Sequence, residues 1–171
     1  MSSASQVSMK HWRALLIMLI ASATVAAVGL RLEPALIYNP SNSVPSGFYL
    51  RTHDPLRPGA IVTVRAAAVA PDYAAARDYA DRTDRFLKRV AATAGQVVCA
   101  DGASISIDGA AIAQRLERDN AGRLLPSWRG CRTLTTGEVF LLGDTVDSFD
   151  GRYWGPTSTG LIEGVWRQLS D

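Results

Sequence analysis

An uninterrupted apolar segment near the N-terminus constrains the fold of this chain more than any other feature. Residues 14–30 carry no charge over 17 positions. A helix of that length rises about 25 Å, which is the short end of what crosses a bilayer. Arg13 and Arg31 flank the segment and can snorkel to the two interfaces, where Trp12 suits an anchor. We therefore expect a transmembrane anchor over residues 14–32, in contact with membrane lipid.

The basic residues that precede the segment, Lys10 and Arg13, predict its orientation. The positive-inside rule keeps such residues in the cytoplasm, so residues 1–13 are expected inside and residues 33–171 outside. The alternative is a cleaved secretory signal, because small residues near positions 24–27 resemble a cleavage region. Both interpretations export the body of the chain.

The cysteines and the net charge restrict the possible ligands. An oxidising compartment favours a disulfide between the two cysteines, Cys99 and Cys131, although two buried thiols remain the alternative. With only two histidines besides, a zinc site built from Cys and His is not expected. The net charge of +2 is too small to indicate a nucleic-acid partner.

The exported part alternates between short apolar runs and turn-forming residues. The pair Asp108-Gly109 separates two alternating stretches and predicts a hairpin. A short helix is expected at Pro71–Tyr79, and Gly143–Pro156 is typical of a turn-rich loop. The strands that we expect are Gly47–Arg51, Ala60–Arg65, Phe86–Ala92, Val97–Cys99, Glu138–Leu142 and Leu161–Leu169. Many short strands and few helices predict a mostly β domain.

Lysine is rare in this chain. Of the 18 basic residues, 16 are Arg, and the two lysines are Lys10 and Lys88. Arg stays protonated under all working conditions, whereas a buried Lys can lose its proton. Lys88 lies beside Phe86 and Leu87 in a segment with strand character, where burial is plausible. On the count alone, chance is the better explanation of one interior lysine.

Two arrangements for nucleophilic catalysis can be compared. A Ser-His-Asp triad has little support, because His53, the one histidine outside the N-terminal segment, follows the pattern of a polar turn. A Ser-Lys dyad needs a desolvated lysine as general base, and Lys88 is the candidate. The candidate nucleophiles are Ser41, Ser43 and Ser46, although their composition alone indicates turn-forming serines.

Three segments, in order, resemble the membrane-bound signal peptidase I family of Ser-Lys proteases, and in particular its conjugative-transfer, TraF-like branch. Asn39–Tyr49 (NPSNSVPSGFY) is similar to the motif of the nucleophile, and Leu87–Val97 (LKRVAATAGQV) to the motif of the base. Gly143–Pro156 (GDTVDSFDGRYWGP) is similar to the third motif, and Asp119–Cys131 is a weaker match typical of the conjugative branch. The resemblance covers nearly the whole chain and implies the family's β fold behind one transmembrane helix.

The resemblance implies roles for individual residues. Ser43 corresponds to the nucleophile and Lys88 to the general base. Ser41 corresponds to the position whose hydroxyl completes the oxyanion hole beside the backbone N–H of Ser43, and Ser148 to the serine that orients the lysine amine. The residues expected to be structural are Asp144, Asp150 and Arg152, the last two as an ion pair.

The chain departs from the family's pattern at three positions, none of which removes a catalytic group. Val44 replaces the Met of the housekeeping enzymes, as in the conjugative branch. Gln96 stands where Asp is usual, which puts one turn interaction in doubt, and Gly151 replaces the usual Ser. No long insertion separates Lys88 from Gly143, so the accessory domain of larger members is not expected.

The family implies an endopeptidase that removes signal peptides from exported precursors at the inner (cytoplasmic) membrane, with its catalytic domain in the periplasm. The conjugative branch implies a pilin precursor as substrate, in some members cyclised, and type IV secretion or mating-pair components as partners. No metal or organic cofactor is implied. The alternatives are a general housekeeping signal peptidase I and a non-catalytic anchored scaffold of a secretion or mating apparatus.

Overall fold

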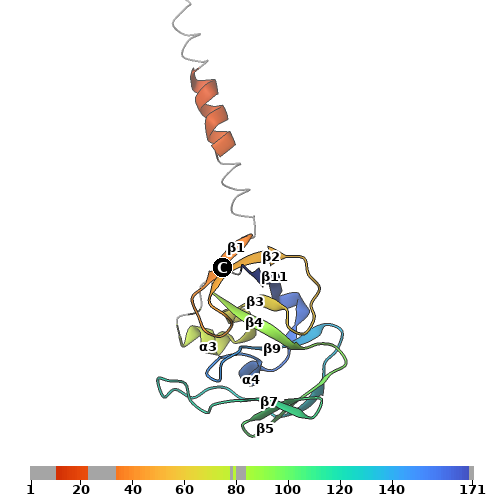
Figure 1. Cartoon of the computed structure of the whole chain (residues 1–171). Helices are drawn as coiled ribbons and strands as arrows, with labels where there is room; N and C mark the ends of the chain where they lie inside the picture. The colour runs from red at the N-terminus through yellow and green to blue at the C-terminus, as the bar shows by residue number, and fades with distance from the viewer. Residues whose placement is uncertain (1–10, 23–33, 78, 80–83, 170–171) are drawn as a thin grey trace, which may run out of the picture. The chain divides into compact units, whose positions relative to one another are not determined.

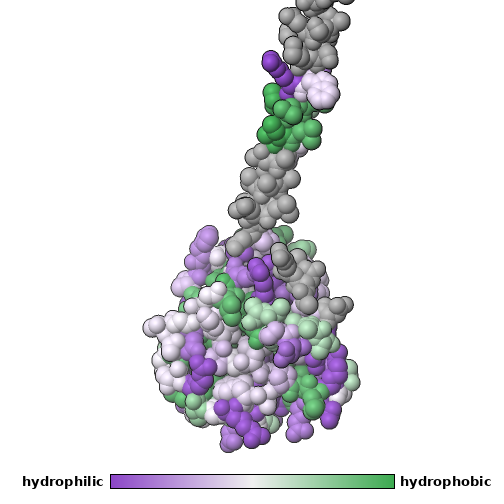
Figure 2. Space-filling view, turned by 180° about the vertical axis from the view of Figure 1, so that it is seen from behind, coloured by the Kyte–Doolittle hydropathy of each residue, from purple (hydrophilic) through white to green (hydrophobic). Residues whose placement is uncertain are grey.

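The structure is a computed structural model that describes residues 11–22, 34–77, 79 and 84–169 (Figure 1). The chain divides into two units, Met1–Pro34 and Ala35–Asp171. In the first unit, residues 11–22 form a helix with exposed apolar side chains, shown in green in Figure 2. Within the described ranges, no helix combines the length and the apolar character that a membrane span requires. Residues 23–32 of the expected anchor lie outside those ranges.

The second unit contains a seven-stranded antiparallel sheet in the order β1-β2-β11-β3-β4-β9-β10 (Figure 1). Its strands are β1 (Leu36–Asn39), β2 (Gly47–Thr52), β3 (Ile61–Arg65), β4 (Arg85–Ala92), β9 (Glu138–Leu142), β10 (Thr157–Ser158) and β11 (Ile162–Gln168). Buried valine and leucine side chains from β3, β4 and β9 form one hydrophobic cluster of the core. Runs of β-branched residues suit such strands because they pack well on a pleated surface.

A second, four-stranded sheet has the order β7-β6-β5-β8. Its strands are β5 (Val97–Asp101), β6 (Ser104–Ile107), β7 (Ala110–Gln114) and β8 (Gly130–Thr133). The predicted hairpin is confirmed between β6 and β7: Asp108 and Gly109 have φ of 51° and 83°, both positive as a type I′ turn requires. A disulfide joins Cys99 of β5 to Cys131 of β8, which are cross-strand partners.

The mostly β class is therefore confirmed, and the differences concern short elements. The short helices are α2 (Ala66–Val69), α3 (Pro71–Ala75), α4 (Gly151–Trp154) and η1 (Thr159–Leu161). The helix expected to reach Tyr79 ends at Ala75, because the Tyr79 N–H bonds back to the carbonyl oxygen of Ala74 and closes a wider turn. The segment of α4 was expected to be loop. Strands β1 and β8 were also not predicted, since every residue of β8 is exposed and no apolar alternation marks it.

Candidate active site

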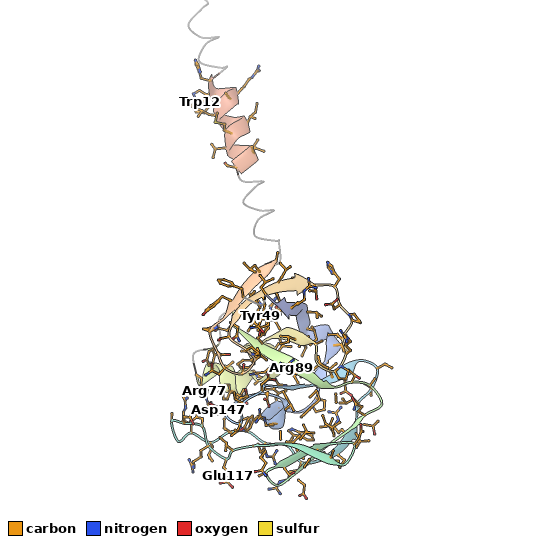
Figure 3. The ribbon with its side chains drawn as sticks, in the orientation of Figure 1. Trp12, Tyr49, Arg77, Arg89, Glu117 and Asp147 are labelled. Atoms are coloured by element: carbon orange, nitrogen blue, oxygen red, sulfur yellow. A yellow bond between two sulfur atoms is a disulfide. The ribbon has the colours of Figure 1, made fainter. Side chains whose placement is uncertain are left out.

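The loop between β1 and β2 carries Ser41 and Ser43. Val44 is fully buried and packs in one cluster with Tyr49 and Leu87, so the core holds the chain directly after Ser43 (Figure 3 labels Tyr49). Ser43 itself is half-buried. Its Oγ lies 3.0 Å from Ser41 Oγ and donates a 3.3 Å hydrogen bond to the carbonyl oxygen of Leu87. The Ser43 hydroxyl is thus held against β4 while it remains accessible.

Lys88 lies on β4 and is 3% exposed. Burial disfavours its charged form and lowers the pKa of the amine from 10.5 to about 8, against the opposing effect of the Asp150 carboxylate. Its Nζ lies 5.8 Å from the centre of the Phe86 ring. An amine with this pKa is deprotonated in a useful fraction of molecules near neutral pH, which is what a general base needs.

Ser43 and Lys88 line the same cavity, of about 470 Å³, together with Ser41 and Ser148. Asp147, labelled in Figure 3, is exposed and also lines it. Ser46 does not line this cavity. The structure therefore brings together the four residues to which the resemblance assigns roles in catalysis, from the β1–β2 loop, β4 and the loop after β9.

The hydroxyls in this cavity are not bonded to the amine. In the described part of the chain, Lys88 Nζ makes no hydrogen bond with Ser43 or Ser148: Ser43 bonds to the backbone of β4, and Ser148 Oγ lies 3.2 Å from Thr145 Oγ1. Hydrogen bonds between catalytic groups are often long in ligand-free structures and tighten when substrate binds. The orienting role of Ser148 stays a prediction.

Asp150 and Arg152 form a buried ion pair behind this cavity. Arg152 donates to the two Asp150 carboxylate oxygens at 2.7 and 2.9 Å, in bidentate geometry. It also donates to the carbonyl oxygens of Gly143, Thr145 and Val146 at 3.2, 2.7 and 3.0 Å. Because one guanidinium binds three carbonyl oxygens of the loop, the pair fixes the backbone that presents Ser148.

Asp144 lies on the outer side of this loop. Its carboxylate accepts two hydrogen bonds from Arg89 of β4, at 2.9 and 2.7 Å, and these bonds lower the pKa of Asp144 (Figure 3 labels Arg89). The side chains of both residues are more than a third exposed. Asp144 thus joins the loop after β9 to β4 through a surface ion pair.

Comparison with known proteins identifies the family of this chain. The family described as signal peptidase, peptidase S26, matches residues 9–168, almost the whole sequence. The chain belongs to the peptidase S26 family. The resemblance inferred from the three motifs is confirmed, and this S26 signal peptidase is a serine peptidase, which hydrolyses peptide bonds.

Two relatives of this S26 peptidase carry the name plasmid transfer protein TraF and come from Escherichia coli. They are 32% and 30% identical to it, and each alignment covers 77% of this chain and 80% of the relative. A crystal structure of a signal peptidase I from Enterococcus faecalis is 18% identical, with a TM-score of 0.40, over 70% of this chain and 100% of that one.

One residue of the S26 peptidase's site was missed by sequence reasoning. Asn39, at the end of β1, is 6% exposed and hydrogen-bonds to the loop of the two serines through both atoms of its amide. The sequence did contain a signal for this role. An Asn stands two residues before Ser41, and an Asn side chain can hydrogen-bond to the backbone two residues further along the chain.

Two of the three departures from the family's pattern, Gln96 and Gly151, have local explanations. Gln96 accepts from the Thr93 N–H at 3.0 Å and donates to Asp108 at 2.9 Å, so an amide closes the turn where Asp is usual. At Gly151 an added Cβ would lie 2.6 Å from the carbonyl oxygen of Leu141. Strand β9 therefore approaches too closely for a serine in this chain.

Proposed function

We propose that this S26 peptidase is a membrane-anchored endopeptidase that removes signal peptides from exported precursors with Ser43 as nucleophile and Lys88 as general base. The observation that carries the proposal is the shared cavity, which a half-buried serine hydroxyl and a buried lysine amine line together. The lowered pKa of Lys88, about 8, supports the assignment because the base must be neutral. Arg at this position could not serve.

The reaction begins with attack of Ser43 Oγ on the scissile carbonyl carbon, while its proton passes to the neutral Lys88 Nζ. The carbonyl oxygen becomes an oxyanion, which accepts hydrogen bonds from the Ser43 N–H and the Ser41 hydroxyl. As the C–N bond breaks, Lys88 gives its proton to the leaving amine, and an ester to Ser43 remains. Water then attacks this ester, Lys88 takes a proton from it, and that proton returns to Ser43 Oγ.

We assign a pilin-type precursor in conjugative transfer as the substrate, with mating-pair or type IV secretion components as partners. Support comes from the names of the two relatives, which are plasmid transfer proteins, and from the resemblance of Asp119–Cys131 to that branch. The proposed location is the inner membrane, with residues 33–171 in the periplasm. The uncharged residues 14–30 and the disulfide support this location.

The test uses the purified full-length protein in detergent with two substrates, a pilin-type precursor and an unrelated precursor with an Ala-x-Ala signal peptide. Mass spectrometry compares wild type, Ser43→Ala and Lys88→Ala, with Ser46→Ala as the matched control outside the cavity. We expect cleavage by wild type and Ser46→Ala only. A cyclic product, lighter by one water than the hydrolysed one, would mean that an amine resolves the ester.

The other outcomes separate the alternatives. Equal cleavage of both precursors would indicate a general signal peptidase. Products that do not depend on Ser43 or Lys88 would overturn the dyad, and absence of cleavage by wild type would favour an anchored scaffold.

A further inference from the structure

Asn39 connects the end of β1 to the serine loop through five hydrogen bonds. Its Nδ2 donates to the carbonyl oxygens of Ser41, Val44 and Pro45 at 2.9, 3.1 and 3.1 Å, so these contacts share two amide hydrogens. Its Oδ1 accepts from the Ser41 N–H at 3.2 Å and from Ser41 Oγ at 2.9 Å. A buried amide that bonds to both ends of a loop holds that loop in one conformation.

The contact with the Ser41 hydroxyl is the one that bears on catalysis. Among the residues that the structure describes, Ser41 Oγ has two partners, Asn39 Oδ1 at 2.9 Å and Ser43 Oγ at 3.0 Å. Ser41 is exposed, so packing does not fix its rotamer. The side chain of Asn39 is buried and therefore supplies the rigid side of this pair.

We propose that Asn39 is a positioning residue that holds the Ser41 hydroxyl at hydrogen-bonding distance from Ser43, so that it is in place to stabilise the oxyanion. This inference rests on the proposed function. Asn39 acts through Ser41, and the hydroxyl turns its one hydrogen from Asn39 Oδ1 to the oxyanion as charge develops there. Because the oxygen of the Ser41 hydroxyl is already in position, this donor does not have to be moved into place during the reaction.

The amide is better suited to this position than the isosteric carboxylate. An Asp would lack the N–H groups that Val44 and Pro45 bond to, and three carbonyl oxygens would face a negative charge. A carboxylate would also hold the Ser41 hydrogen more strongly, because charge-assisted hydrogen bonds are about twice as strong as neutral ones. Asn39→Asp is therefore expected to lower kcat although it preserves the shape of the side chain.

A double-mutant cycle tests the inference. Full-length wild type, Asn39→Ala, Ser41→Ala and the double variant are assayed in detergent on a precursor with an Ala-x-Ala signal peptide. We expect Ser41→Ala to lower kcat about 10²- to 10³-fold, as loss of an oxyanion donor does. Asn39→Ala should lower kcat by up to about 10²-fold, the effect of misplacing a group by about 1 Å, with KM little changed. In the Ser41→Ala background, Asn39→Ala should have almost no further effect on kcat.

A purely structural role for Asn39 gives a different result. Its loss would then lower kcat by the same factor in both backgrounds, and that outcome overturns the inference, as does an unchanged kcat in Asn39→Ala. Asn120→Ala, an exposed asparagine outside the cavity, is the matched control and should leave kcat unchanged. If Asn39→Ala does not fold by circular dichroism, Asn39→Asp takes its place in the cycle.

Ser43→Ala is measured in parallel. If it cleaves like wild type, the proposed function is wrong and this inference is wrong with it. If Ser43→Ala is inactive and the cycle is additive, the positioning role alone is wrong.

Discussion

The backbone N–H of Asp144 donates a 2.6 Å hydrogen bond to the carbonyl oxygen of Ser43. The same residue binds Arg89 through its carboxylate, so Asp144 links the β1–β2 loop to β4, the strand of Lys88. Ser43 and Asp144 are far apart in the sequence, and one short backbone hydrogen bond joins them next to the cavity. A change in the backbone at this contact should alter the position of Ser43 relative to Lys88.

Gly143→Ala tests this contact. An added Cβ at Gly143 would lie 2.6 Å from Ser148 Cβ and 2.9 Å from the carbonyl oxygen of Ser43, so both segments must shift. We expect a loss of about 1–3 kcal/mol in the free energy of unfolding, as for other overpacked sites. Peptidase activity should fall by at least the same factor as the fraction of folded protein. Urea denaturation and a precursor-cleavage assay measure the two effects.

The matched control for that variant is Gly137→Ala. An added Cβ at Gly137 has no neighbour within 4 Å. Stability and activity should stay near those of wild type, and equal losses in both variants would contradict the close-contact explanation.

The pH dependence of cleavage reports the protonation of Lys88. Because the neutral amine is the active form, kcat/KM of the wild type should rise with pH and reach half of its plateau near pH 8. Lys88→Arg should show no cleavage across this range, since a guanidinium stays protonated. A flat profile between about pH 6 and 9 would contradict the assignment of Lys88 as the base.

The stability of the protein should show the cost of burying the same amine. The folded-state pKa of about 8 lies below the ordinary value of 10.5, so between these values the unfolded chain binds more protons and wild-type stability rises with pH. Below pH 8 the amine is charged in the folded and the unfolded state, so the full cost of burying the charge lowers the free energy of unfolding. Lys88→Met, which removes the charge, should therefore raise the free energy of unfolding by up to about 3 kcal/mol at pH 7. The gain relative to wild type should shrink towards zero as pH rises to about 10.5; a gain that is independent of pH would have another cause.

The buried ion pair should be much more sensitive than the surface pair. Asp150→Asn leaves the Arg152 guanidinium buried without a carboxylate, which typically costs about 3–5 kcal/mol. Asp144→Asn is the control, because its pair with Arg89 is exposed and worth at most about 1 kcal/mol. Chemical denaturation of both variants at one pH measures the difference. Similar losses would show that burial does not determine how much these ion pairs contribute to stability.

Removal of the disulfide should affect stability without affecting chemistry. The bond between Cys99 and Cys131 closes a loop with a sequence separation of 32, for which chain entropy predicts a loss of about 3–4 kcal/mol. Both cysteines lie on the four-stranded sheet, and neither lines the cavity. The variant Cys99→Ala/Cys131→Ala should therefore melt at a lower temperature and retain wild-type kcat when assayed well below that temperature. A fall in kcat there would mean that this sheet takes part in substrate binding.

Features that depend on neighbours in the sequence could be predicted from the sequence. The turn at Asp108-Gly109 is such a case, because positive φ is a property of single residues. The β-branched run of β3 and the apolar run of β9 likewise predicted strands from adjacent residues alone. The resemblance of three motifs was also sufficient to name the family and to select Ser43 and Lys88 as candidates.

The tertiary structure decided what depends on distant neighbours. The pKa of Lys88 falls because β4 is buried by other strands, and no local pattern measures that desolvation. The bonds of Asn39 to the serine loop and the one-turn helix α4, which the buried Asp150 caps, likewise arise from how loops are packed together. The short strand β8 exists through backbone pairing with β5 and has no apolar pattern of its own. The sequence thus determined the local conformations of this peptidase and the chemical groups that it carries. Long-range packing decided how deeply those groups are buried, and therefore their protonation and the distances between them.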